Sequence, residues 1–183
     1  SVSRRRLLQG GAAAAPAILT LVSTPVRATY YTTPASSFAS INSSRPRDTY
    51  TVGGCKPSWW VNCALSSWPA ACKDAAGNPK KFKDCFADHA TYGNKTLKEC
   101  MQLTYDTGMD GMVKHLCAAY LNAASGKVPY EVCSMPYARG IWSTYMSRGY
   151  HEPTAGVKWY CDSCTPAGNG GVTPWLKTTM PYA

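Results

Sequence analysis

The stretch MDGMVKHLCAAYLNAASG, residues 109–126, decides the fold. Apolar side chains recur in it at steps of three and four residues, which is the period of a helix with one buried face. The stripe consists of Met109, Met112, Val113, Leu116, Cys117, Tyr120 and Ala124. Ser125 and Gly126 end the predicted helix, because glycine tolerates the left-handed conformation of a C-terminal cap. We interpret His115, beside the stripe, as a hydrogen-bonded structural residue rather than a metal ligand.

Two further helices are predicted around this one. Thr96 and Glu99 have the spacing of a capping box that opens a helix, and its expected buried face is Leu97, Cys100, Met101 and Thr104. A third helix is expected after Pro136 and ends at Gly149, with a buried face of Ala138, Ile141, Trp142 and Tyr145. The chain beyond it is predicted to form turns. The sequence therefore predicts a mainly α, small helical domain over residues 55–183.

The first 28 residues have the pattern of an export signal. Arg4, Arg5 and Arg6 form a charged start, small and apolar residues follow, and Ala28 offers a cleavage site. The Ser-Arg-Arg-x-apolar-Leu order is typical of a bacterial twin-arginine signal. The apolar run is shorter than the roughly 20 residues that a membrane span needs. We therefore expect the leader to be cleaved, which would leave the protein without a stable membrane span. We expect the protein to be exported, to the periplasm or to the cell surface and extracellular space.

Residues 29–54 are rich in Ser, Thr, Tyr and Pro and have no helical period, which favours an extended chain. One interpretation is a flexible linker. The other is an extended N-terminal arm that adds a short β element by pairing with a sheet edge or a neighbouring subunit. Its candidate assembly residues are Tyr30, Tyr31, Phe38, Ile41 and Tyr50.

The charge of the chain falls once the expected leader is set aside. The whole sequence has a formal net charge of +9, whereas residues 29–183 hold 15 basic against ten acidic residues, a net charge of +5. Such a balance favours solubility and weak attraction to anionic surfaces. It gives no reason to expect a nucleic-acid partner.

Nine cysteines follow the leader: Cys55, Cys63, Cys72, Cys85, Cys100, Cys117, Cys133, Cys161 and Cys164. Outside the cytoplasm such thiols normally oxidise, so we expect a disulfide-stapled domain. The spacing does not give the connectivity, and an odd count leaves at least one thiol free or paired with another chain. The C-x-x-C of residues 161–164 is interpreted as a structural disulfide, with a redox site and a metal site as the alternatives.

The aromatic residues say more about function than catalytic motifs do. The chain has 12 Tyr and six Trp against three Phe, and the first two types pack a ring while offering a donor at a wet boundary. Trp59, Trp60, Trp159 and Tyr160 are candidates for a ligand-facing surface, with core packing as the alternative. No metalloprotease, nucleophile-elbow, phosphate-loop or haem-attachment motif is present in the sequence. No catalytic residue, metal ligand or cofactor is predicted.

The segment CKPSWWVNC, residues 55–63, together with the following Trp68-Pro69, is similar to the C-x-P-G-Y-W-K-N-H … W-P segment of a group of secreted bacterial proteins. Residues 115–124, 150–159 and 176–180 also resemble that group, in the same order. The resemblance implies a secreted helical module and no particular reaction. The chain departs from the pattern at Ser58, where the group has glycine, and at Cys63, where it has histidine. The added cysteine is interpreted as a staple.

Three functions remain open from the sequence, and the first is the leading hypothesis. It is a secreted structural or surface protein that assembles with copies of itself, as a filament, matrix or surface-layer subunit, through the arm and the aromatic residues. The second is a module that binds a carbohydrate or another ligand, such as a surface glycan. The third is a metal- or thiol-dependent redox protein, which would explain a twin-arginine leader.

Overall fold

The computed structural model describes residues 53–130, 132–165 and 170–180, without the side chains of residues 164 and 165. The expected export signal and almost all of the expected arm lie outside the described residues. So do the candidate assembly residues Tyr30, Tyr31, Phe38, Ile41 and Tyr50, and the side chain of Cys164. Helices dominate the described part, and one small antiparallel sheet accompanies them. The prediction of a mainly α domain is confirmed.

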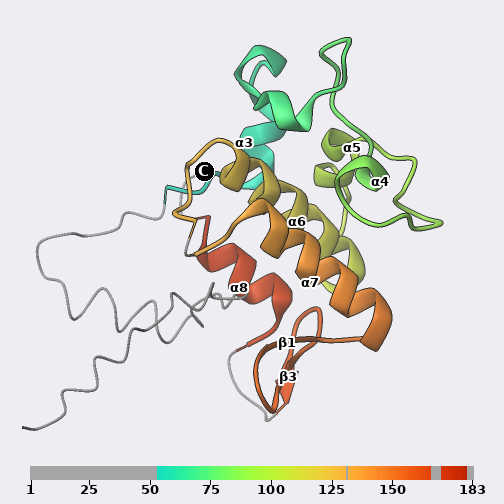
Figure 1. Ribbon diagram of the computed structural model, residues 1–183, viewed down its shortest axis with the longest axis vertical. Helices are drawn as coiled ribbons and strands as arrows, with labels where there is room; N and C mark the ends of the chain where they lie inside the picture. Colours follow the sequence, from blue (N-terminus) through green and yellow to red (C-terminus); the bar gives the residue numbers. More distant parts are fainter. Residues whose placement is uncertain (1–52, 131, 166–169, 181–183) are drawn as a thin grey trace, which may run out of the picture.

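Helix α6, Gly108–Ala124, lies at the centre of the fold, and α3, α5, α7 and α8 all contact it. Figure 1 shows α7 and α8 running in much the same direction as α6, with α7 drawn between the other two in this view. Five of the seven residues of the predicted stripe are buried, and its end residues Met109 and Ala124 are half-buried. The prediction of a single buried face was too narrow, because nearly all side chains between Gly111 and Asn122 are buried. At the end of the helix Ser125 donates its backbone N–H to Leu121 (2.9 Å), and Gly126 has a φ of 69°. The predicted glycine cap is therefore formed.

The capping-box helix is present but shorter than predicted. Helix α5 spans Leu97–Met101, and Thr96 and Glu99 cap it reciprocally at its first turn. It ends because Gln102 leaves the helical conformation (φ −91°, ψ 2°) while its N–H closes the last turn. Thr104 consequently lies beyond the helix and is exposed, so its placement on the buried face was wrong.

Helix α7, Met135–Arg148, begins slightly before the predicted point. Ser134 caps it by accepting the Tyr137 N–H, and Pro136 lies in the first turn, where its missing N–H has no helical partner to lose. Gly149 ends the helix in the left-handed conformation, with a φ of 75°. Three of the four predicted core residues are fully buried and the fourth is half-buried: Ala138, Ile141, Trp142 and Tyr145.

The region predicted as turns contains two features that the sequence did not indicate. Strands β1 (His151–Thr154), β2 (Val157–Trp159) and β3 (Cys164–Thr165) form an antiparallel sheet in that order. The short β element of the described part therefore lies near the C-terminal end. Helix α8, Val172–Thr178, buries Trp175 and other side chains against α6.

The N-terminal part of the described chain covers one end of α6 with short elements. These are α3 (Pro57–Asn62), the 3₁₀ turns η2 (Leu65–Ser67) and η3 (Ala70–Cys72), and α4 (Phe82–Cys85). Asn122 of α6 holds the beginning of this part. Its Oδ1 accepts hydrogen bonds from the Cys55 N–H and the Trp60 Nε1–H, and its Nδ2 donates to the Cys55 carbonyl, each at 2.9 Å.

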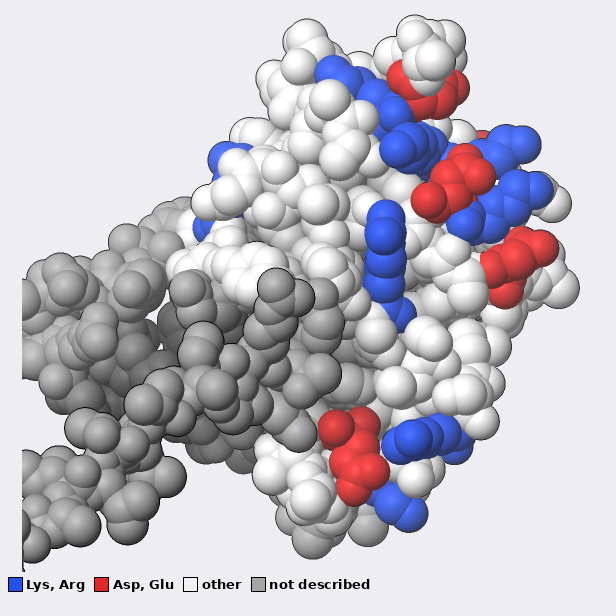
Figure 2. Space-filling view, viewed as in Figure 1, with Lys and Arg blue, Asp and Glu red and all other residues white. Residues whose placement is uncertain are grey.

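No helix in the described residues is long and apolar enough to cross a membrane. On the face seen in Figure 2, Lys and Arg side chains are interspersed with Asp and Glu. The mixture agrees with the modest net charge of the chain beyond its expected leader.

Two helical glycines provide a matched test of this packing. A Cβ on Gly111 of α6 would lie 2.5 Å from the Asp106 carbonyl carbon, whereas a Cβ on Gly140 of α7 meets nothing within 4 Å. We expect Gly111→Ala to destabilise the protein by about 1–3 kcal/mol through overpacking. Gly140→Ala should stabilise it by roughly 0.5–1 kcal/mol, because alanine is the better helix former. Urea unfolding of both variants checks this, and equal effects of one sign would contradict the close approach.

Candidate functional site

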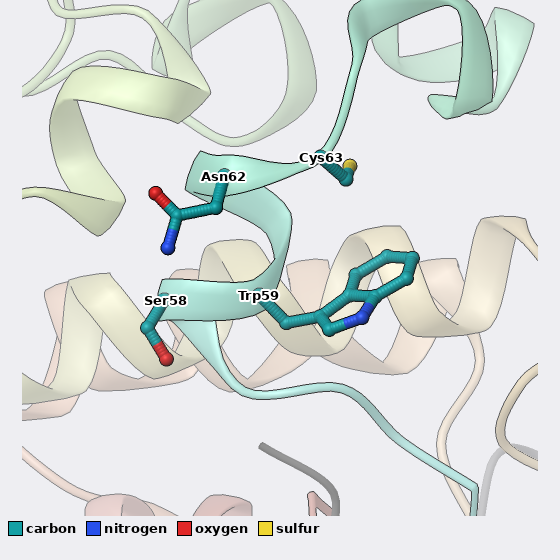
Figure 3. Close-up of a pocket in the computed structure, with 4 residues that line it drawn as sticks. All are labelled: Ser58, Trp59, Asn62 and Cys63. Carbon is teal, nitrogen blue, oxygen red and sulfur yellow. The ribbon is translucent and has the colours of Figure 1, made fainter.

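The outer side of α3 carries a shallow pocket. It has a volume of about 290 Å³ and is lined by Ser58, Trp59, Asn62 and Cys63. In Figure 3 the side chains of Ser58 and Asn62 point to one side of the helix and those of Trp59 and Cys63 to the other. The pocket is therefore built from two pairs of residues four positions apart, which share faces of a helix.

The local sequence explains why this short helix forms. Pro57 occupies the first helical position, where its fixed φ suits a helix start. Trp60 is completely buried on the inner face, and its indole N–H is satisfied by Asn122. Its carbonyl oxygen also accepts the Nε1–H of Trp68 at 3.2 Å. These buried contacts fix the helix, so the opposite face is presented outward.

Trp59 is half-buried, and its ring is held from two directions. It meets the Trp60 ring edge-to-face, with the centroids 4.9 Å apart. The ammonium of Lys127 lies 4.8 Å from the Trp59 centroid, a cation–π contact. A ring fixed in this way loses little freedom when a ligand packs against it.

The polar groups of the pocket can serve a ligand that carries hydroxyl groups. Ser58 and Asn62 are exposed, and their side chains offer donors as well as acceptors. Cys63 is half-buried, and its Sγ donates to the Trp60 carbonyl oxygen at 3.4 Å. Burial raises the pKa of the Cys63 thiol, with Trp68 and Lys98 opposing the shift. The Cys63 sulfur is therefore a neutral, weakly polar wall of the pocket.

The four aromatic candidates from the sequence are not brought together. Trp59 lines the pocket, but Trp60 is fully buried and is not available to a ligand. Trp159 is buried at the end of β2, whereas Tyr160 is 36% exposed. Tyr160 meets Tyr150 edge-to-face at 6.3 Å. Core packing, the alternative interpretation, is therefore correct for Trp60 and Trp159.

Sequence reasoning missed Ser58, Asn62 and Lys127 as companions of Trp59. The signal for the first two was present, since Ser58 and Asn62 follow Pro57 at helical spacing. Nothing in the sequence indicated Lys127, which follows the C-terminal end of α6 and reaches the Trp59 ring from there.

His115 is hydrogen-bonded as predicted. Its Nε2 lies 2.9 Å from Oδ1 of Asp106, while its Nδ1 is buried without a hydrogen-bond partner. Burial lowers the pKa of His115, and hydrogen bonding to Asp106 opposes that shift. Burial would raise the pKa of Asp106, but hydrogen bonds from Lys177 and His115 outweigh it and lower that pKa to about 2. Through its contact with Lys177, Asp106 therefore connects the segment that precedes α6 to helix α8.

His151 is enclosed by two hydroxyl groups of α7. Its Nε2 lies 2.9 Å from the Tyr137 hydroxyl and its Nδ1 lies 3.0 Å from the Thr144 hydroxyl. Burial lowers the pKa of His151 to about 4, with a small opposing effect of Glu152. The imidazole is therefore neutral in the native protein at pH 7.

The pKa of His151 predicts an acid-sensitive fold. The unfolded chain takes up this proton near pH 6.5, whereas the native state does so only near pH 4. Stability from the neutral ring is complete above pH 6.5 and is lost as the pH falls, by up to about 3 kcal/mol near pH 4. We expect His151→Gln to remove this part of the pH dependence. Urea unfolding between pH 7 and pH 4 checks it, and parallel curves for the two proteins would contradict it.

The eight cysteines whose side chains are described are free thiols, so the predicted disulfide framework is not formed among them in this structure. Burial raises the pKa of six of these thiols, to about 12 at Cys72 and Cys133: Cys63, Cys72, Cys85, Cys117, Cys133 and Cys161. A redox or nucleophilic cysteine needs a lowered pKa. The raised pKa values of these six cysteines therefore argue against a redox or nucleophilic role for them.

The C-x-x-C segment has the same character where it is described. Cys161 is half-buried, and its Sγ donates to the Tyr145 hydroxyl at 3.0 Å. Burial raises its pKa, and the Tyr145 contact only partly opposes the rise. Within the described residues, no three His, Cys, Asp or Glu side chains converge in a way that could hold a metal ion.

No protein-family model, curated protein or solved structure matches this chain. Evidence for the function of this chain therefore comes from its residues and their geometry.

Proposed function

We propose that this chain is an exported module that binds a carbohydrate-like ligand in the α3 pocket. The observation that carries the proposal is the fixed, half-buried ring of Trp59 in a pocket that is also lined by Ser58 and Asn62, whose exposed polar side chains project from the other side of the helix. A sugar ring offers an apolar face for stacking and hydroxyl groups at its rim. Trp59 would take the face, and Ser58 and Asn62 would take the hydroxyls.

The size of the pocket restricts the ligand. Ligand pockets commonly begin near 300 Å³, and the α3 pocket, at about 290 Å³, is at that limit. A single sugar unit at the end or the side of a larger glycan is therefore the proposed occupant. Export is supported by the twin-arginine-like leader of residues 1–28, which would deliver the module to the periplasm or the cell surface, where glycans are found.

Calorimetric titration tests this function. The probes are soluble glucose and N-acetylglucosamine oligosaccharides and cell-wall glycan fragments. We expect at least one probe to bind, and Trp59→Ala to weaken its binding at least tenfold, because the stacking surface is lost. The matched control is Tyr105→Ala, which removes an aromatic side chain that is 67% exposed and lies outside the pocket. Equal binding by the two variants, or no binding of any probe, would refute the proposal.

Self-assembly is the second candidate function, and one surface favours it. Tyr160 is exposed beside Tyr150, and the Lys158 ammonium lies 4.7 Å from the Tyr150 ring centroid. Tyrosines are enriched at protein interfaces. The expected arm would add the second contact. Light scattering across a concentration series checks this: assembly that Tyr160→Ser abolishes would support it, and a monomer at every concentration would exclude it.

We also propose that the domain is stapled by disulfides after export. Its compartment would be oxidising, and most of the described cysteines are buried in the core rather than displayed as reactive thiols.

A further inference from the structure

Four of the nine cysteines gather around the central helix. They come from separate elements: Cys72 ends η3, Cys85 ends α4, Cys100 lies in α5 and Cys117 lies in α6. All four side chains are buried, and Cys72, Cys100 and Cys117 are completely so. Burial raises the pKa of the Cys117 thiol, and the neighbouring Cys100, Cys85 and Cys72 raise it further, in that order.

We propose that Cys100 and Cys117 are oxidised to an intrachain disulfide that fastens α5 to α6. The two helices pack directly against each other, and both cysteines are fully buried in the core that the helices share. The inference rests on the proposed export, since only an oxidising compartment would maintain the bond.

The reaction is a thiol–disulfide exchange. A protein disulfide of the compartment accepts the two electrons and two protons of the Cys100 and Cys117 thiols. One S–S bond forms in this chain, and the oxidant leaves as a dithiol. Because burial raises the pKa of the Cys117 thiol, the exchange must occur while the core is still open, during or before folding. The chain would then have to fold after export, which favours a leader of the general secretory type over the twin-arginine route, since the latter carries folded proteins.

This pairing also bears on the odd cysteine. Once Cys100 and Cys117 are paired, Cys72 and Cys85 remain available to each other, and Cys85 lies within electrostatic range of Cys72. Cys133 is only 1% exposed, and its Sγ lies 3.9 Å from the Ser134 carbonyl oxygen. A thiol buried to this extent is not accessible to a second chain. We therefore expect Cys133 to be the unpaired cysteine and to make no link between chains.

Tryptic mapping tests the pairing, because trypsin separates the three cysteines onto different peptides. Peptide 99–114 contains Cys100 as its only cysteine, peptide 115–127 contains only Cys117, and peptide 128–139 contains only Cys133. Exported full-length protein is unfolded in denaturant with N-ethylmaleimide, digested without reduction and analysed by mass spectrometry. We expect peptides 99–114 and 115–127 as one linked species that separates on reduction. Peptide 128–139 should carry the maleimide.

Two results would overturn the proposal. One is alkylation of either Cys100 or Cys117 before reduction, and the other is a link from either of them to a different cysteine. As controls, Cys133→Ser should leave the 99–114 to 115–127 link intact, whereas Cys100→Ser should release peptide 115–127 in alkylated form. Glycan binding, measured on the same sample before digestion, reports on the α3 pocket independently. A missing link with intact binding would reject only the disulfide, and the reverse would reject only the binding function.

Discussion

Replacing Asn122 with alanine is expected to lower the free energy of unfolding by about 3–5 kcal/mol. Its side chain is completely buried and makes three hydrogen bonds, one to the Trp60 indole and two to the backbone of Cys55. Alanine would leave all three partner groups buried without a partner. Each such group costs about 1–3 kcal/mol, although repacking recovers part of the total.

Urea unfolding followed by circular dichroism measures this loss. Asn62→Ala is the matched control, because Asn62 is an exposed asparagine of α3. Its stability should stay within about 0.5 kcal/mol of that of the unmodified protein. A loss of less than about 1 kcal/mol for Asn122→Ala would contradict the role of Asn122 in joining α3 to α6.

Replacing Trp142 with alanine is expected to destabilise the protein by about 3–5 kcal/mol. Trp142 of α7 is fully buried and meets the Phe82 ring edge-to-face at 4.9 Å. It also contacts the rings of His89 and Tyr92, and its Nε1–H donates to the Ala87 carbonyl oxygen at 3.2 Å. The variant would leave a cavity and an unpaired carbonyl among the aromatic side chains that connect α4 and the segment after it to α7.

Thermal and urea unfolding check this second result. Tyr105→Ala is the control, since the Tyr105 side chain is mostly exposed and its loss should change stability by less than about 0.5 kcal/mol. Hydrogen exchange of the backbone in residues 82–95 should rise in Trp142→Ala before that of α6. Equal stability of the two variants would show that α7 does not hold this layer.

The central helix and its neighbours were predictable because their signals are local. The apolar steps of residues 109–124, the Thr96–Glu99 capping box and the glycines at 126 and 149 each lie within a few residues of the structure they determine. Helix α8 was missed because it is only seven residues long and holds Pro174 in its first turn. The hairpin was missed because the bulge between His151 and Thr154 interrupts the alternation of a strand.

The candidate site could be predicted only in part. Trp59 and Trp60 are adjacent in sequence and look alike, but one lines a pocket and the other is sealed in the core. The difference is decided by Asn122, which is 62 positions away from Trp60. Contacts across such distances leave no local pattern. The same holds for Cys100 and Cys117, whose proximity follows from the packing of two helices.

In the proposed function, Trp59 of the α3 pocket is the tryptophan that contacts the ligand. The most direct test is fluorine NMR of the exported protein labelled with 5-fluorotryptophan, which gives one resonance for each of the six tryptophans. Trp59→Phe assigns the key resonance. On addition of the glycan probes, we predict a shift of the Trp59 resonance while that of the buried Trp60 stays nearly in place. An unchanged Trp59 resonance with every probe, or shifts of other tryptophans that persist in Trp59→Phe, would contradict the account.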